Sequence, residues 1–188
     1  MADFSPRNEE QWALRQHIAA KCGISHVEVE RVVSGTGIRN VYDFVWARAV
    51  RRLGDAPCEL AHGAIHAAVT NSSEPAAIIA AHAMHTSPEA DALCCEALDL
   101  FLDCLGAEAA NVALRHLPRG GVVLGGGGLV PKLLPHILGG RVASAYLDKG
   151  ATTDVYRGIP LVALELSGDE LGRLGAWQHA WQGYRCSD

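Results

Sequence analysis

The sequence predicts an α/β fold that is rich in helices and has few strands. Two short apolar runs, at residues 122–124 and 159–166, have the length and composition of buried strands. Most of the remaining chain places apolar residues at helical spacing, and a helix expected over 87–117 is its longest element. A layered α/β domain packs its helices on a sheet of several strands, so part of the sheet is missing from this chain.

The first strand leads directly into four consecutive glycines at residues 125–128, and a helix is expected over 130–138 with Pro131 in its first turn. Glycines let the backbone approach a ligand closely, and the amides at a helix start attract anions such as phosphate. A simple strand-to-helix connection needs one or two glycines, so four favour a ligand-binding loop. The dinucleotide G-x-G-x-x-G and the P-loop patterns both fail here, so any nucleotide is held in a different way.

The first third of the chain predicts two helices. One spans 8–21, since Asn8 and Gln11 have capping-box spacing and Gly23 is placed to end it. Residues 26–33 alternate polar and apolar side chains, which favours a short strand, although a single helical turn also fits. The second helix spans 38–53. Its expected core residues are Val41, Phe44, Val45, Ala49 and Val50.

The middle of the chain is less uniform. For residues 58–70 the pattern does not decide between helix and loop, because Gly63 and two histidines weaken a helical pattern. Ser73 caps a helix that reaches about residue 84, and a second cap signature at Ser87 opens the long helix, which Pro118 ends. The inward stripe expected for this long helix is Leu93, Ala97, Leu98, Phe101, Leu105, Ala109 and Val112.

Beyond the glycine-loop helix, residues 142–147 predict a short strand or extended segment, and 148–150 a turn. The second buried strand, 159–166, tolerates Pro160 only near its start or at a sheet edge. A final helix is expected over 169–182.

Composition limits the classes of function. The chain has 188 residues, 49% of them hydrophobic, which suits one domain with a sizeable core. A net charge of -5 without a basic, aromatic-interleaved stripe argues against a nucleic-acid partner. No apolar run has membrane length, no signal peptide is visible, and six scattered cysteines suggest free thiols, so we expect a soluble cytoplasmic protein without a membrane partner.

One pair of side chains could bind metal, and its pattern is weak. His62 and His66 stand four apart, which on a helix would place two imidazoles on one face. No H-E-x-x-H pattern or third ligand accompanies them, so a metal-dependent hydrolase is the weakest hypothesis. Cys94, Cys95 and Cys104 lie in the long helix and are interpreted as small core residues.

Glu30 places a carboxylate inside an otherwise apolar alternation, next to Arg31 and just ahead of a glycine turn. A carboxylate accepts paired hydrogen bonds from vicinal hydroxyls or from an arginine, so Glu30 could hold a sugar. On pattern alone, a solvated strand residue is the favoured interpretation.

Several blocks occur in order along the chain: Asp3-Phe4-Ser5-Pro6 with Glu9-Glu10, Glu30-Arg31-Val32-Val33-Ser34-Gly35-Thr36-Gly37-Ile38, Gly126-Gly127-Gly128-Leu129-Val130-Pro131-Lys132, Asp148-Lys149-Gly150 and Leu174-Gly175-Ala176. Together, over nearly the whole chain, these blocks resemble the bacterial-type (group A) glucokinases, which favours a functional role for Glu30.

The resemblance implies a two-lobed enzyme of the actin-like ATPase (ribonuclease H-like) fold. Such an enzyme transfers the γ-phosphoryl group of ATP to the 6-hydroxyl of glucose with Mg²⁺, giving glucose 6-phosphate. By resemblance, Glu30 hydrogen-bonds sugar hydroxyls, and Gly126, Gly127 and Gly128 form the glycine motif on the adenosine side. Related enzymes are often dimers, so a homodimer is a further expectation.

The resemblance also implies what residues 1–188 lack. The chain starts at about the histidine of the family's E-G-G-H sugar motif, so the phosphate loop, the small lobe and its aspartate general base are absent. We therefore expect the C-terminal, large-lobe part of a glucokinase, with an unpaired strand edge, no catalytic residue or metal ligand of its own, and little or no activity alone. The alternative is a non-catalytic, sugar-kinase-like binding or regulatory module.

Overall fold

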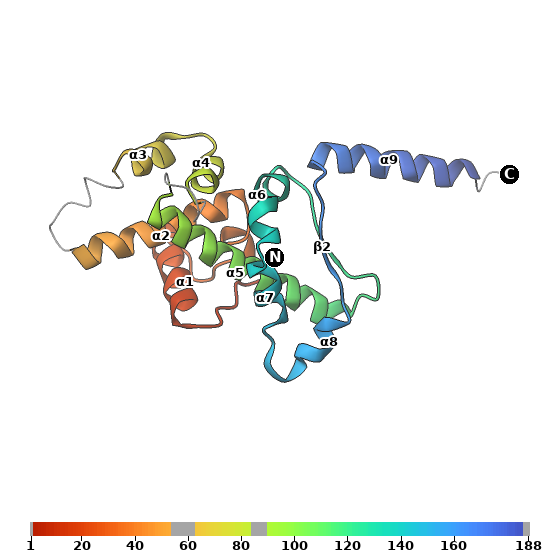
Figure 1. Cartoon of the computed structure of the whole chain (residues 1–188), viewed down its shortest axis with the longest axis horizontal. Coiled ribbons are helices and arrows are strands. Elements are labelled where there is room, and N and C mark those ends of the chain that lie inside the picture. The colour runs from red at the N-terminus through yellow and green to blue at the C-terminus, as the bar shows by residue number, and fades with distance from the viewer. Residues whose placement is uncertain (1, 54–62, 84–89, 186–188) are drawn as a thin grey trace. The chain divides into compact units, whose positions relative to one another are not determined.

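The computed structural model describes residues 2–53, 63–83 and 90–185. The chain forms two compact units, residues 1–108 and 109–188, and each is described by itself (Figure 1). Helices dominate both, as the sequence predicts. No helix in the described part of the chain is long and apolar enough to cross a bilayer.

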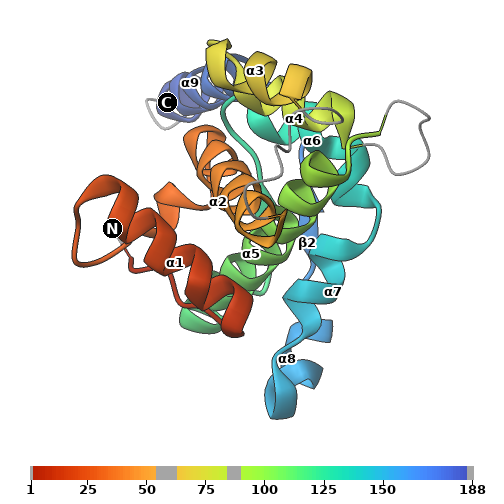
Figure 2. The same ribbon diagram turned by 90° about the vertical axis from the view of Figure 1, so that its left-hand side faces the viewer.

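The described residues of the first unit form helices and turns, together with one isolated bridge between Asp3 and Glu28. Its elements are α1 (Glu9–Cys22), the 3₁₀ turn η1 (Val29–Arg31), α2 (Gly35–Leu53), α3 (Gly63–Asn71), α4 (Pro75–His82) and the first part of α5 (Ala92–His116) (Figure 2). Helix α2 contacts α1, η1 and α4, and α3 contacts α4. Tyr42, Phe44 and Phe101 are among the largest fully buried side chains of this unit.

Helix α1 begins and ends where the sequence predicts. The Asn8 side chain accepts a hydrogen bond from the Gln11 amide at 2.9 Å, and Gly23 closes the helix with φ of 65°. The Gln11 side chain accepts from the Arg7 amide at 2.9 Å, one residue earlier than a full capping box requires. A polar cap and a left-handed glycine therefore set both ends of α1.

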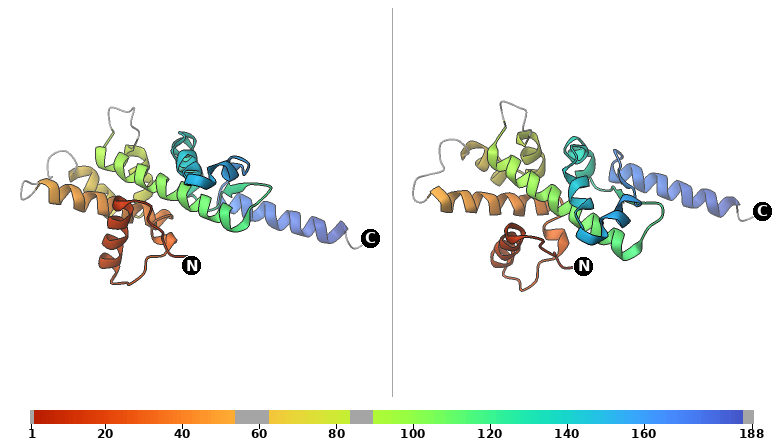
Figure 3. Two further views of the ribbon diagram at one scale, coloured as in Figure 1. Left: turned by 90° about the horizontal axis from the view of Figure 1, so that it is seen from below. Right: turned by 60° about the horizontal axis from the view of Figure 1, so that its bottom comes forward.

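The second unit holds a two-stranded parallel sheet. Strands β1 (Val122–Leu124) and β2 (Leu161–Ala163) pair in parallel, with Val122 opposite Leu161 and Leu124 opposite Ala163. The helical elements are α6 (Leu129–Leu138), α7 (Arg141–Leu147), η2 (Gly150–Thr152), α8 (Thr153–Arg157) and α9 (Gly168–Arg185), which Figure 3 draws in blue as one continuous helix.

The two faces of this sheet differ. Val122 packs in a buried cluster with Ala110 of α5, Tyr146 of α7 and Tyr156 of α8, whose rings meet edge to face at 5.5 Å. On the opposite face, Val123 and Val162 are 57% and 43% exposed. The part of the sheet that the structure describes therefore has one packed and one open face.

Several sequence predictions are wrong or only partly right. Ser73 does not cap α4, because the N-cap is Glu74 and makes no side-chain hydrogen bond there. Residues 142–147, expected as a strand, form helix α7, because Val142, Ala145 and Tyr146 are buried at helical spacing. Within residues 26–33, Val29–Arg31 form the single 3₁₀ turn η1, and Glu28 is the one residue of this segment that makes a strand-like bridge, to Asp3. Val50 and Val112, expected in the core, are 40% and 37% exposed.

The cysteines of the long helix are core residues, as predicted. Cys94, Cys95 and Cys104 are buried and unpaired. Burial raises the pKa of all three thiols, that of Cys104 to about 12, so they stay protonated at neutral pH.

Gly37 allows η1 and the first turn of α2 to pack backbone against backbone. A Cβ atom at this position would overlap the carbonyl group of Val32 and come within 3.0 Å of its Cα. Neither contact can be relieved by rotating a side chain, so η1 and α2 would have to separate.

We predict that Gly37→Ala lowers the free energy of unfolding by about 1 to 3 kcal/mol, because the new methyl group meets backbone. Urea denaturation followed by circular dichroism measures this. Gly35→Ala is the matched control, since a Cβ atom there has no neighbour within 4 Å. Equal stability of the two variants would contradict the close packing of η1 on α2.

Candidate functional site

Glu30 lies in the 3₁₀ turn η1, and its side chain is exposed. The turn is closed by backbone hydrogen bonds from the Val32 and Val33 amides to the Val29 carbonyl, at 2.9 and 2.7 Å. An exposed carboxylate on a closed turn is available to a ligand. Water solvates its charge in the free protein, so presenting it carries no desolvation penalty. This arrangement differs from the strand expected for this segment.

The N-terminal segment reaches the same turn. The Phe4 amide donates to the Val27 carbonyl at 2.8 Å, and the Val29 amide donates to the Ala2 carbonyl at 3.0 Å. Phe4 is buried and anchors the segment. The first two sequence blocks behind the glucokinase resemblance are therefore neighbours in space.

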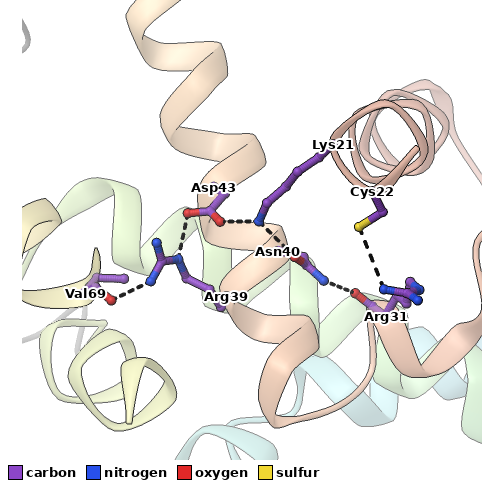
Figure 4. A network of polar contacts seen from close by, with 7 residues as sticks. All are labelled: Lys21, Cys22, Arg31, Arg39, Asn40, Asp43 and Val69. Atoms are coloured by element: carbon purple, nitrogen blue, oxygen red, sulfur yellow. Dashed lines mark hydrogen bonds and ion pairs between the residues drawn. The ribbon is translucent and has the colours of Figure 1, made fainter. Parts of the chain in front are cut away.

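Asn40 of α2 holds the end of the turn. Its side-chain amide donates to the Arg31 carbonyl at 2.9 Å, and its oxygen accepts from Lys21 Nζ at 3.1 Å (Figure 4). Arg31 follows Glu30 in the chain, so this hydrogen bond restrains the backbone next to Glu30, the candidate sugar-binding residue. Asn40 was not singled out in the sequence, because a lone asparagine inside a helix has no distinctive pattern.

An ion-pair network surrounds Asn40 and joins three helices. Asp43 accepts from Lys21 of α1 at 2.6 Å and from Arg39 Nε at 2.8 Å, and Arg39 also donates to the Val69 carbonyl of α3 at 2.6 Å (Figure 4). The Asp43 side chain is 17% exposed, so solvent screens these pairs less than ordinary surface pairs. The network therefore helps keep Asn40 aligned with the turn.

The glycine loop follows β1, as predicted, and a different structural feature accounts for glycine at each position. Gly126 and Gly127 have φ of 85° and 58°, a region that side chains other than glycine rarely adopt. At Gly125 a Cβ atom would meet Leu164 and Leu171 at 3.4 Å. Gly128 is the N-cap of α6 and supplies no side-chain cap.

The loop is also tied to the segment that follows β2. The Leu164 amide donates to the Leu124 carbonyl at 2.9 Å, and the Gly168 amide donates to the Gly127 carbonyl at 3.1 Å. A Cβ atom on Gly168 would lie 2.8 Å from the Gly127 nitrogen. The carboxyl ends of both parallel strands thus lead into one backbone-to-backbone contact, at the edge where ligands bind in open α/β sheets.

Helix α9 begins beside this contact with a complete capping box, S-x-x-E. The Ser167 amide and hydroxyl donate to Glu170 Oε2 at 2.8 and 2.7 Å, and the Glu170 amide donates to Ser167 Oγ at 3.3 Å. These hydrogen bonds hold the pKa of the Glu170 carboxyl below its usual range. The spacing is visible in the sequence, whereas the contact of Gly168 with the glycine loop is not.

The predicted histidine pair receives no structural support as a metal site. His62 lies outside the described residues. The His66 ring stacks on Trp46 with centroids 3.6 Å apart and an interplanar angle of 6°, and burial lowers the pKa of His66. Among the residues that the structure describes, no three His, Cys, Asp or Glu side chains gather as metal ligands.

We predict that Asn40→Asp loosens the Glu30 turn, because a carboxylate cannot donate to the Arg31 carbonyl but can still accept from Lys21. Loss of about 1.4 kcal/mol would speed hydrogen exchange at the Val33 amide about tenfold. Amides of α5 serve as internal controls. Unchanged exchange at Val33 would show that Asn40 does not hold the turn.

Comparison with known proteins adds independent findings. A family model described as Glucokinase matches residues 1–182. The chain is 34% identical over 177 residues to a glucokinase of Nostoc sp. strain PCC 7120, covering 93% of the chain and 50% of that protein. It is 35% identical over 162 residues to one of Trichormus variabilis, covering 85% and 46%.

A solved structure supports the fold. The crystal structure of a glucokinase from an Antarctic psychrotroph superposes with a TM-score of 0.63 at 22% identity, over 87% of this chain and 44% of that one. The chain thus spans about half the length of the relatives it matches and corresponds to a C-terminal portion of them.

Proposed function

This chain belongs to the glucokinase family, and we propose that it supplies the nucleoside-binding loop and one sugar ligand of an ATP-dependent glucose kinase. The reaction would transfer the γ-phosphoryl group of ATP to the 6-hydroxyl of glucose, in the cytoplasm. The observation that carries the proposal is the glycine loop after β1. Gly126 and Gly127 have positive φ angles in this loop, and a backbone hydrogen bond joins Gly127 to Gly168 at the start of α9.

On the nucleotide side, Gly126, Gly127 and Gly128 present backbone without side chains. Flat groups such as a nucleoside can lie directly against such a surface. The α6 N-terminus adds a favourable field for the phosphates, since no side chain caps its first amides. This chemistry explains how a nucleotide could bind although neither common glycine fingerprint is present.

On the sugar side, the Glu30 carboxylate would accept hydrogen bonds from glucose hydroxyls. Its side chain is exposed, and hydrogen bonds to Asn40 and to the Val29 carbonyl hold the turn that presents it. A carboxylate fixed in this way orients the sugar rather than removing its proton. The general base of the transfer is assigned, in this proposal, to a polypeptide segment outside residues 1–188.

Mg²⁺ would neutralise charge on the phosphates during transfer. Kinases hold this ion by one or two carboxylates together with the nucleotide phosphates. The proposal assigns no residue of this chain to the ion.

We predict that Gly168→Ala weakens binding of ATP to the chain about tenfold or more, because its methyl group would displace Gly127 and distort the loop. Isothermal titration calorimetry with ATP and Mg²⁺ measures the affinity. The matched control is Gly172→Ala in the same helix, where a Cβ atom has no neighbour within 4 Å. Equal ATP affinities of the two variants would show that the glycine loop does not take part in nucleotide binding.

We predict that Glu30→Gln weakens glucose binding by about 10 to 100-fold, since hydrogen bonds to a charged acceptor contribute about 1.5 to 3 kcal/mol. Titration with millimolar glucose, followed by amide chemical shifts of η1, measures the change. Glu28→Gln removes the same charge two residues away and is the control. A Glu30→Gln variant that binds glucose like the parent chain would refute the sugar-ligand role.

A further inference from the structure

Two histidines of the first unit pack against helix α2, which lies between α1 and α3 (Figure 2). His17 of α1 meets the ring of Phe44 edge to face, with centroids 5.7 Å apart. His66 of α3 stacks on Trp46, with centroids 3.6 Å apart. Phe44 and Trp46 are separated by about 200° around α2, so one histidine contact lies on each side of this helix.

Each of these imidazoles has one ring nitrogen that is buried and makes no hydrogen bond to a described residue. The two atoms are Nε2 of His17 and Nδ1 of His66. A neutral imidazole tolerates such burial, because one of its nitrogens carries no proton and needs no acceptor. An imidazolium carries a proton on both nitrogens, so its buried N–H group would lose its hydrogen bond to water without a replacement.

Burial is the strongest influence on the charge of His17. It disfavours the imidazolium, and so do two neighbouring cations, Lys21 of α1 and Arg51 of α2. Asp43 of α2 acts in the opposite direction, but the balance holds the pKa of His17 below 6.5. The ring therefore gains a proton more readily when α1 leaves α2.

His66 has a similar environment on the other side of α2. Burial again lowers its pKa below 6.5, Asp43 acts against this shift, and Arg39 adds to it. Helix α4, which packs on α3, has no Asp, Glu, Lys or Arg between its first residue, Pro75, and its last, His82. It therefore offers no carboxylate to an imidazolium at His66.

These contacts place one titratable ring in each of two helix interfaces. We propose that protonation of His17 and His66 loosens α1 and α3 from α2, so that the first unit contains an acid-sensitive switch. Each histidine binds a proton more tightly when its helix is undocked. Docking of both helices is therefore strongest above pH 6.5 and weakens as the pH falls below this value.

The helices that this switch would loosen also support the turn of Glu30. Lys21, in the last turn of α1, donates to Asn40, and Arg39 donates to the Val69 carbonyl of α3. Loosening either helix would remove one of these contacts from the network behind the turn. If Glu30 binds glucose, this binding would weaken below pH 6.5; that consequence rests on the proposed function, whereas the switch itself does not.

NMR titration of the imidazole signals and hydrogen exchange, both on the full chain, test the switch. His17 and His66 should each titrate below pH 6.5. The protection factors of the Ile18 amide in α1 and the Val69 amide in α3 should fall several-fold between about pH 7.5 and about pH 5.5, because short undocked helices fray in water. Amides of β1 and β2 in the second unit should keep their protection.

His66→Phe keeps a ring against Trp46 but cannot take up a proton, so it should abolish the pH response of α3. His17→Phe should do the same for α1. The matched control is His26→Phe, an exposed position of the same unit, which should leave both responses unchanged.

Titration of either histidine at or above pH 6.5 would overturn the proposal, and so would protection factors that do not change with pH. A pH response that survives His17→Phe and His66→Phe would also overturn it. A loss of protection shared by β1 and β2 would indicate general acid unfolding in place of a switch.

Glucose titration at the same two pH values tests the link to the sugar site. Weaker binding at the lower pH in the parent chain, but not in the chain with both phenylalanine substitutions, would support the link. Equal binding by the parent chain at both values would refute it. Absence of glucose binding at either pH would refute the proposed sugar site, while the exchange measurements would still decide the switch.

Discussion

The direct backbone contact between Gly127 and Gly168 is the constraint on which the candidate nucleotide site depends. It joins the loop after β1 to the start of α9 by a hydrogen bond of 3.1 Å and leaves no room for a Cβ atom. Because the strands are parallel, their carboxyl ends meet at one edge, and this contact links the two segments that leave it. The capping box of Ser167 and Glu170 then fixes where α9 begins.

Similar backbone contacts support Glu30, the candidate sugar-binding residue, in the first unit. Gly37 lets α2 pack on the backbone of Val32, and Asn40, one turn later, holds the carbonyl of Arg31. Both candidate ligand-binding segments are therefore short irregular stretches held by backbone contacts to a helix, rather than by their own side chains. Such support leaves the ligand-facing groups exposed while the backbone behind them stays ordered.

Local patterns predict α1, α2, α4, α5, α6, α9 and the glycine loop, since caps, prolines and apolar periodicity act within a few residues. They leave the region of α3 open and do not predict α8. Asn8 and Gly23 bound α1 as expected, and β1 leads into its glycines as expected. Residues 142–147 were mistaken for a strand because a seven-residue amphipathic helix and a short strand have similar apolar content. The contacts of Gly37, Asn40 and Gly168 join distant segments, so periodicity and spacing could not reveal them.

The family relationship came from blocks of residues in order, and the comparisons confirmed it, whereas the roles of Glu30 and of residues 126–128 stay proposals. The most direct test of the whole account is ADP release from Mg-ATP and glucose, measured for this chain alone and mixed with the N-terminal half of the Nostoc relative. The account predicts turnover only in the mixture, because the proposal assigns ligand-binding segments to this chain and the general base to the other part. Turnover by residues 1–188 alone would contradict it, and ligand binding without turnover in the mixture would favour a non-catalytic binding module.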